Sequence, residues 1–317
     1  MNLQTKIPLE KESKNQIDYN SNVLLLGSCF SENIGKKLDY FKFQNFQNPF
    51  GILFHPKAIE TLISNAVEHK VYSEKEVFFN NEQWHCFDAH SKLSNTSKEH
   101  LISQLNNQIN FTASKLKIAS HIIITLGTTW IYRVVKSNAI VANCHKVPQK
   151  QFNKELLSVD EVTDSLKNIL SLIRSINYEA SIIFTVSPVR HLKDGFIENT
   201  QSKAHLLAAI HQVVSPLGAR GLYFPSYEIM MDELRDYRFY DEDMIHPNQT
   251  AINYIWDKFK EVWISDSAFK TMDAVDSVQK GFQHKAFNSK SEAHQKFLQK
   301  LEAKKNQLQL QFPHIVF

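Results

Sequence analysis

The chain has 317 residues and a formal charge of +3, with 43% hydrophobic and 22% charged residues. This composition predicts a globular fold with one main domain and additions, and it excludes a fibrous or wholly disordered chain. The small charge and the scattered basic residues give no reason to expect a nucleic-acid partner.

The N-terminus lacks the apolar stretch of a signal peptide, and no apolar run approaches the ~20 residues of a membrane span. Cys29, Cys86 and Cys144 match neither a disulfide framework nor a zinc-ligand spacing. We therefore expect a cytoplasmic protein in a reducing compartment, with no membrane partner. The sequence leaves the oligomeric state open.

Short apolar runs predict buried parallel strands at Asn22 to Ser28, His121 to Gly127, Ser181 to Ser187, and Gly221 to Pro225. Between these runs, apolar residues recur with helical spacing at Val159 to Ile176 and at Lys203 to Val214. A last regular helix is expected to start at His246 and Pro247, because proline suits a first helical turn. Strands that alternate with helices predict a doubly wound α/β sheet.

Two segments depart from this alternation. Residues 56–116 contain a group of aromatic residues and are interpreted as an insertion, a lid or small subdomain, that covers one end of the sheet. After about residue 265 the chain is rich in Lys, Gln, Ser and Glu, which predicts a solvated helical tail packed through Phe297 and Leu301. The expected division is a main domain at 1–265 and a C-terminal helical extension at 266–317.

Ser28 stands at the carboxyl end of the first predicted strand, where open parallel sheets bind their ligands. If Ser31 caps the following helix, the free backbone amides and the positive helix terminus lie near Ser28 and could stabilise an oxyanion. The alternative is a strand-to-helix turn that simply requires a small residue.

A serine nucleophile needs a base and a group that orients the base. Asp243 and His246 stand just before the last predicted helix. In that turn Asp243 could hold one imidazole nitrogen while the other faces Ser28. The alternative for His246 is a helix-capping or core histidine.

The stretch G-S-C-F-S at 27–31 resembles the motif that names the GSCFA domain family, whose members resemble the SGNH (GDSL-like) hydrolases. Further matching stretches are N-P-F-G at 48–51, L-G-T-T-W at 126–130, F-T-V-S-P-V-R-H at 184–191, S-K-A at 202–204, F-P-S-Y-E-I-M-M-D-E-L-R-D-Y-R-F-Y at 224–240, and D-M-I-H-P at 243–247. The resemblance spans about residues 22–265. It implies a flavodoxin-like doubly wound parallel sheet of the SGNH hydrolase type.

The resemblance also implies roles for single residues. Ser28 would be the nucleophile, His246 the base and Asp243 the group that orients it. The backbone amides of Ser28 and Gly51 would hold the oxyanion. Cys29 replaces part of the usual helix-entry pattern and is expected to be a buried small hydrophobe.

The chain departs from the superfamily at Gly127-Thr128-Thr129-Trp130, where Gly-x-Asn-Asp is usual. Loss of a good oxyanion donor costs on the order of a hundredfold or more in rate. Activity therefore requires that Thr129, the Trp130 indole or Asn143 substitutes for the asparagine.

Arg190 and His191 follow a predicted strand at the ligand-binding end and could grip an anionic or hydroxyl-rich substrate, or form a loop salt bridge. Aromatic residues could form a wall for stacking a sugar or could pack in the core; they are Trp84, Trp130 and Tyr132. The remaining metal-binding side chains follow no standard zinc pattern, so we expect neither a metal nor another cofactor; they are His85, Cys86, Asp88, His90, Cys144 and His145.

These observations predict a serine ester hydrolase that acts on a small O-acyl ester, such as an acetyl group on a carbohydrate. The choice of substrate rests on analogy with the superfamily. Two alternatives stay open: an acyltransferase with the same triad, and a non-catalytic carbohydrate or protein binding module that lost its oxyanion donor.

Overall fold

The computed structural model describes residues 5–214, 221–285, 287–288 and 291–317. The described residues form a central five-stranded parallel sheet in the order β10-β9-β5-β1-β2. Its strands are β1 (Val23–Gly27), β2 (Asn45–Gln47), β5 (His121–Leu126), β9 (Ser181–Val186) and β10 (Gly221–Phe224). The order reverses at β1, which is the arrangement of flavodoxin-like doubly wound sheets. The predicted fold class is confirmed.

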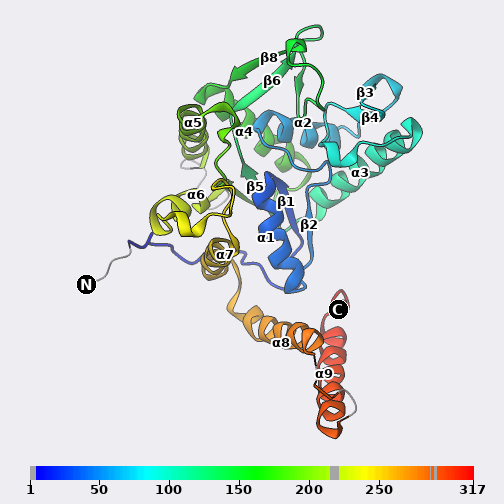
Figure 1. The fold of residues 1–317 in the computed structure, drawn as a ribbon, viewed down its shortest axis with the longest axis vertical. Helices are drawn as coiled ribbons and strands as arrows, with labels where there is room; N and C mark the ends of the chain where they lie inside the picture. Colours follow the sequence, from blue (N-terminus) through cyan, green and yellow to red (C-terminus); the bar gives the residue numbers. More distant parts are fainter. Residues whose placement is uncertain (1–4, 215–220, 286, 289–290) are drawn as a thin grey trace.

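Helices cover both faces of this sheet (Figure 1). One face packs against α2 (Pro56–Val67), α3 (Lys98–Ile118), α4 (Val159–Ile176) and α5 (Phe196–Val214). The other face packs against α1 (Cys29–Tyr40) and α7 (Gln249–Trp263). Because successive strand residues point to opposite faces, Leu24 and Leu26 join the first layer while Val23 and Leu25 join the second. This explains why the strands are continuous apolar runs in the sequence.

The four predicted strands are found within one residue of their expected ends, and α4 has the predicted bounds. Two helix starts differ from the prediction. Helix α5 begins at Phe196, before the expected Lys203. Helix α7 begins at Gln249, because the Asn248 side chain accepts a hydrogen bond from the Ala251 amide at 3.1 Å and caps the helix. The expectation that Pro247 occupies the first turn is therefore wrong.

Two small antiparallel sheets add to the central one. The hairpin β3 (Val77–Asn80) and β4 (Gln83–Cys86) lies between α2 and α3, so residues 56–116 contribute two helices of the sheet layer as well as a hairpin. The other small sheet consists of β6 (Trp130–Val134), β7 (Ile140–Val141) and β8 (Phe152–Leu156). One-turn and irregular helices complete the fold: η1 (Glu74–Glu76), η2 (Ser91–Leu93), η3 (Gln149–Gln151), η4 (Leu192–Asp194), α6 (Ser226–Glu228), the π-helical η6 (Ile229–Glu233) and η7 (Tyr237–Phe239).

The C-terminal helices α8 (Asp266–Gln283) and α9 (Glu292–Gln311) extend away from the sheet as a pair, drawn orange to red in Figure 1. The predicted helical tail is confirmed. Leu301 is buried in contact with α8, whereas Phe297 stays 39% exposed. None of the helices in the described ranges combines the length and apolar character needed to cross a membrane.

Candidate active site

Several loops meet at the carboxyl edge of the central sheet, and backbone hydrogen bonds connect them. The Ser28 amide donates to Thr125 O at 3.0 Å, which ties the end of β1 to β5. The Ser187 amide donates to Leu126 O at 2.8 Å and ties the end of β9 to β5. The loops after three neighbouring strands therefore form one connected surface, at the edge where open parallel sheets bind ligands.

Ser28 is the N-cap of α1 and is fully buried. Its Oγ accepts a hydrogen bond from the Phe30 amide at 3.4 Å. Ser31 was expected to be the cap, but it lies inside the helix and its hydroxyl donates to Leu26 O at 3.1 Å. Because Ser28 is the cap, its own side-chain oxygen lies at the positive end of the helix, where a negative charge is stabilised.

Gly27 allows this sharp entry from strand to helix. Its φ is +126°, and a side chain added there would clash with the backbone of Thr125. Only glycine fits such a position at low cost.

Cys29 is the first residue of α1 and is only partly buried, whereas the sequence predicted a buried residue. Partial burial is the largest of the causes that raise the pKa of its thiol; Glu32 raises it too, and Lys203 opposes the shift. The thiol therefore stays protonated at neutral pH and is a weak nucleophile.

Asp243 and His246 form the carboxylate–imidazole pair that the sequence suggested. Asp243 Oδ2 lies 2.6 Å from His246 Nδ1. Asp243 Oδ1 accepts the backbone amides of Ile245 at 2.8 Å and His246 at 2.9 Å. These hydrogen bonds, above all the one from the His246 amide, lower the pKa of Asp243 to about 2. A charged carboxylate only accepts hydrogen bonds, so His246 Nδ1 carries a proton and Nε2 can act as the acceptor.

The loop that carries this pair lies beside the loop after β9. The Arg190 amide donates to Ile245 O at 3.2 Å. The charge of His246 also contributes to lowering the pKa of His191. Within the described residues, no hydrogen bond joins Ser28 Oγ to His246.

His191 connects the two sides of the site. A Cβ added to Gly127 would lie 3.0 Å from His191 Nε2 and 3.4 Å from Ser28 Cβ. Both side chains therefore pack against the same glycine, and a larger residue at 127 would separate them or displace one of them. His191 thus lies next to Ser28, on a loop bonded to the loop of His246.

The expected oxyanion donors already donate within the protein. The Ser28 amide bonds to Thr125 O, and the Gly51 amide donates to Asn48 O at 2.8 Å. The Thr129 hydroxyl is buried and donates to Ser202 Oγ at 3.1 Å. Among the proposed substitutes, the Trp130 indole donates to Glu198 O at 3.3 Å, and the Asn143 side chain accepts the His145 amide at 2.8 Å.

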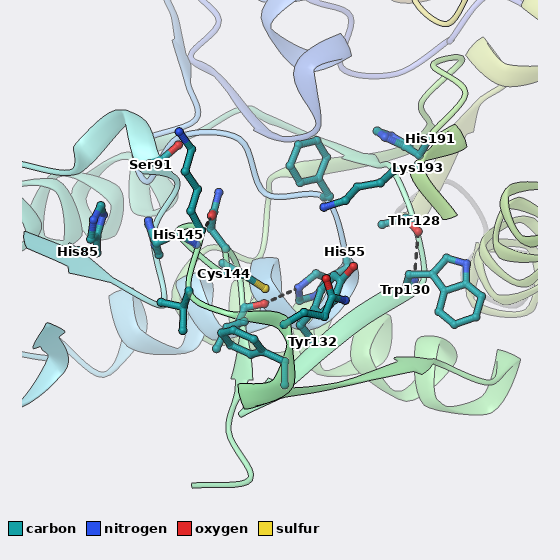
Figure 2. Close-up of a pocket in the computed structure, with 18 of the residues that line it drawn as sticks. His55, His85, Ser91, Thr128, Trp130, Tyr132, Cys144, His145, His191 and Lys193 are labelled. Carbon is teal, nitrogen blue, oxygen red and sulfur yellow. Dashed lines mark hydrogen bonds between the residues drawn. The ribbon is translucent and has the colours of Figure 1, made fainter. Parts of the chain in front are cut away.

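A pocket with a cavity volume of about 920 Å³ opens beside this edge (Figure 2). His191 and Lys193 line one side of it, and His85 and His145 the opposite side. Of the expected substrate-binding residues, Trp130, Asn143 and His191 line this pocket. Arg190 lines a separate pocket, where its guanidinium lies 5.6 Å from the ring centroid of Tyr240.

A family model described as "GSCFA family" matches residues 22–259, which is most of the chain. The chain belongs to the GSCFA family. A second model, "GSCFA domain protein, C-terminal domain", matches residues 275–317 of this GSCFA protein. No curated protein matches it in sequence.

One solved structure similar to the GSCFA protein is an acetyl xylan esterase from the rumen bacterium Butyrivibrio proteoclasticus. The TM-score is 0.37 and the sequence identity 11%; the match covers 77% of this chain and 64% of the esterase, less than two thirds of its length. At this similarity the likeness carries no argument about the activity of the GSCFA protein.

Two of the histidines that invited a metal interpretation make hydrogen bonds of their own. His85 bonds to Ser94 Oγ at 2.6 Å and to Asn80 O at 2.9 Å, and His145 Nε2 donates to Cys86 O at 2.8 Å. In the ranges that the structure describes, no three His, Cys, Asp or Glu side chains are grouped as metal ligands.

Sequence reasoning assigned no role to Lys203, although S-K-A was among the matching stretches. Lys203 is buried, and its ammonium donates to Gly127 O at 2.8 Å and to Ser187 O at 2.7 Å. Burial lowers its pKa to about 7. The helical spacing in the sequence could have indicated this burial, because it places Lys203 on the apolar face of α5 together with Leu206 and Ile210.

Asn48 is another residue without an assigned role. Its Oδ1 accepts the Gly27 amide at 2.9 Å, directly before Ser28. Its Nδ2 is buried and has no hydrogen-bond partner in the described part of the chain. Asn48 therefore fixes the approach to the Ser28 turn.

Proposed function

We propose that this GSCFA protein is a serine ester hydrolase with Ser28 as nucleophile, His246 as general base and Asp243 as the group that orients the base. The observation that carries the proposal is the Asp243–His246 pair, with its 2.6 Å contact, on a loop bonded to the loop of His191. His191 in turn shares Gly127 as a neighbour with Ser28. The position of Ser28 Oγ at the N-terminus of α1 supports the nucleophile assignment, because the helix end stabilises a developing alkoxide.

In the proposed reaction, Ser28 Oγ attacks the acyl carbonyl while its proton moves to His246 Nε2. The tetrahedral intermediate collapses, the alcohol leaves with that proton, and an acyl-serine remains. Water then repeats the same steps and releases the acid. Because Ser28 is fully buried, the ester reaches Oγ only when the side chains around it shift.

The surroundings of Ser28 favour a small acyl group. A Cβ on Gly127 would meet Phe54 O at 3.1 Å as well as Ser28 and His191, so little space remains beside the nucleophile. An acetyl group suits such a site better than a long chain does.

The 920 Å³ pocket is the proposed site of the alcohol part of the ester, and its lining suits a carbohydrate. Trp130 and Tyr132 offer aromatic faces, and Asn143 offers polar atoms for hydroxyl groups. The Lys154 ammonium lies 4.3 Å from the Trp130 ring centroid, so stacking on Trp130 is expected on the other face.

A second candidate is a carbohydrate or protein binding module without catalysis. The observation that favours it is that the expected oxyanion donors, the amides of Ser28 and Gly51 and the Thr129 hydroxyl, already have acceptors. An acyltransferase would use the same triad and differs only in the group that accepts the acyl chain.

Labelling with a fluorophosphonate, followed by mass spectrometry, tests the proposal at the level of one residue. We expect the label on Ser28. Ser28→Ala should lower kcat/KM for p-nitrophenyl acetate by on the order of 10⁴-fold or more. Ser28→Gly is the matched control for capping, since glycine replaces a serine cap at lower cost in stability than alanine; it should be just as inactive.

Cys29→Ala is the control for the neighbouring thiol and should keep activity within a few-fold of the wild type. Label on Cys29, or undiminished hydrolysis by both Ser28 variants, would contradict the assignment. An inactive wild type that still binds an oligosaccharide would favour the binding module.

A further inference from the structure

The imidazole of His191 lies where the edge of the sheet meets the large pocket. It lines that pocket and packs against Gly127, the glycine that also contacts Ser28. The His191 amide donates to Asn199 Oδ1 at 3.0 Å, and its ring meets Phe54 edge to face with centroids 5.5 Å apart. These contacts fix both the backbone and the ring beside the proposed nucleophile.

His191 Nε2 is buried and has no hydrogen-bond partner among the described residues. A buried polar atom of this kind is costly, and native proteins pair the great majority of them. An unpaired nitrogen beside the proposed nucleophile is therefore an open position for a ligand atom. The amides of Ser28 and Gly51 and the Thr129 hydroxyl, by contrast, already donate within the protein.

The surroundings of His191 keep its ring uncharged. Burial, the largest cause, together with the charges of Lys203 on α5 and of His246 on the neighbouring loop, lowers the pKa of His191 to about 3. A neutral imidazole carries one proton, and with that proton on Nε2 it is a hydrogen-bond donor. Neutral histidine donors that polarise a carbonyl are a known solution in enzymes.

We propose that His191 is a catalytic residue that donates a hydrogen bond from Nε2–H to the oxyanion formed at the ester carbonyl attacked by Ser28. The inference rests on the proposed function. The proton stays on His191 throughout, while the Ser28 proton moves to His246. Lys203 is a positioning residue, because its ammonium holds the carbonyls of Gly127 and Ser187 and so joins the turns that follow β5 and β9 beside the Ser28 turn.

Two substitutions separate a donor from a base. His191→Gln keeps an N–H donor but cannot accept a proton at neutral pH, whereas His191→Phe keeps a ring and loses the donor. With p-nitrophenyl acetate, His191→Phe should lower kcat by about 100- to 1000-fold with KM changed only a few-fold. His191→Gln should recover at least tenfold of that loss.

His191→Ala gives a second test that does not depend on fitting a larger side chain. At pH 8, added imidazole should raise its kcat, while 1-methylimidazole, which has no N–H in its neutral form, should not. Equal rescue by both compounds would assign His191 as a base and overturn the donor role.

The outcomes also separate this inference from the proposed function. If Ser28→Ala is inactive but His191→Phe is as active as the wild type, only the role of His191 is wrong. If His191→Gln is as inactive as His191→Phe, the donor role is wrong as well. If Ser28→Ala keeps full activity, the serine hydrolase proposal and the role of His191 both fall.

Discussion

The two sides of the candidate site differ in how they are held. Ser28 and the Lys203 side chain are buried at the carboxyl edge of the sheet, His191 is half-buried beside them, and hydrogen bonds to the ends of β5 and β9 fix the turns there. Asp243 and His246 stand on a loop, with about half of each side chain exposed. The nucleophile side is thus set by the core of the fold, whereas the base side depends on its own short turn and can adjust to a substrate.

The largest expected effects come from the exposed side. His246→Ala should lower kcat by on the order of 10⁴-fold, and Asp243→Asn should approach that loss because the imidazole loses its orienting charge. The measurement is steady-state hydrolysis of p-nitrophenyl acetate.

Asp241→Asn is the matched control, because Asp241 lies in the same loop and its Oδ1 accepts the neighbouring Glu242 amide at 3.0 Å, with no imidazole involved. It should be nearly as active as the wild type. If Asp241→Asn lowered kcat as much as Asp243→Asn, the loss would reflect a general disturbance of the loop. The specific role proposed for Asp243 would then be wrong.

An effect of intermediate size is expected from Lys203, on the pH dependence of the free energy of unfolding. Its pKa is lowered from the ordinary 10.5 of a lysine to about 7, so between these pH values the unfolded chain binds the proton more strongly than the folded chain does. Stability therefore rises as the pH rises from about 7 towards 10. Relative to Lys203→Met, the wild-type free energy of unfolding should gain on the order of a few kcal/mol over this range.

Urea denaturation of both proteins at pH 6, 8 and 9.5 measures this difference. Below pH 7 the two curves should run parallel, since the wild type then keeps its buried charge. Parallel curves at all three values would mean that the Lys203 ammonium stays charged in the folded protein.

The smallest expected effect concerns Thr129. Because its hydroxyl donates to Ser202, Thr129→Val should cost about 1 kcal/mol of stability. It should change kcat less than threefold, in contrast to His191→Phe. Thermal denaturation and ester hydrolysis measure the two quantities, and a loss of a hundredfold in kcat would restore Thr129 as the oxyanion donor that the sequence suggested.

Local sequence was sufficient for the features that depend on short-range chemistry. Apolar runs identified four strands of the sheet, and the Asp-x-x-His spacing brought Asp243 and His246 together. Local sequence was not sufficient where two residues suit the same role. Ser28 and Ser31 both suit a helix cap, and the turn at Gly27 makes Ser28 the cap. β2 has only three residues and shows no periodicity.

The hydrogen bonds of Thr129 and Lys203 could not be predicted from the sequence for a different reason. Whether Thr129 is available depends on Ser202, 73 positions away, and Lys203 meets Gly127 across 76 positions. Such contacts follow from how α5 packs on the sheet, which no local pattern encodes. The unpaired nitrogen of His191 is visible only when all its neighbours are in place.

Residues that follow α9 pack against Tyr19, which precedes β1. The ring centroids of Phe312 and Tyr19 are 4.9 Å apart, and Ile315 is completely buried in the apolar cluster that contains Tyr19 and Phe43. A shortened protein that stops before α8 would leave this cluster uncovered and would tend to aggregate. Residues of α9 and the segment after it thus shield this apolar cluster from water, and an exposed patch of this kind would promote association.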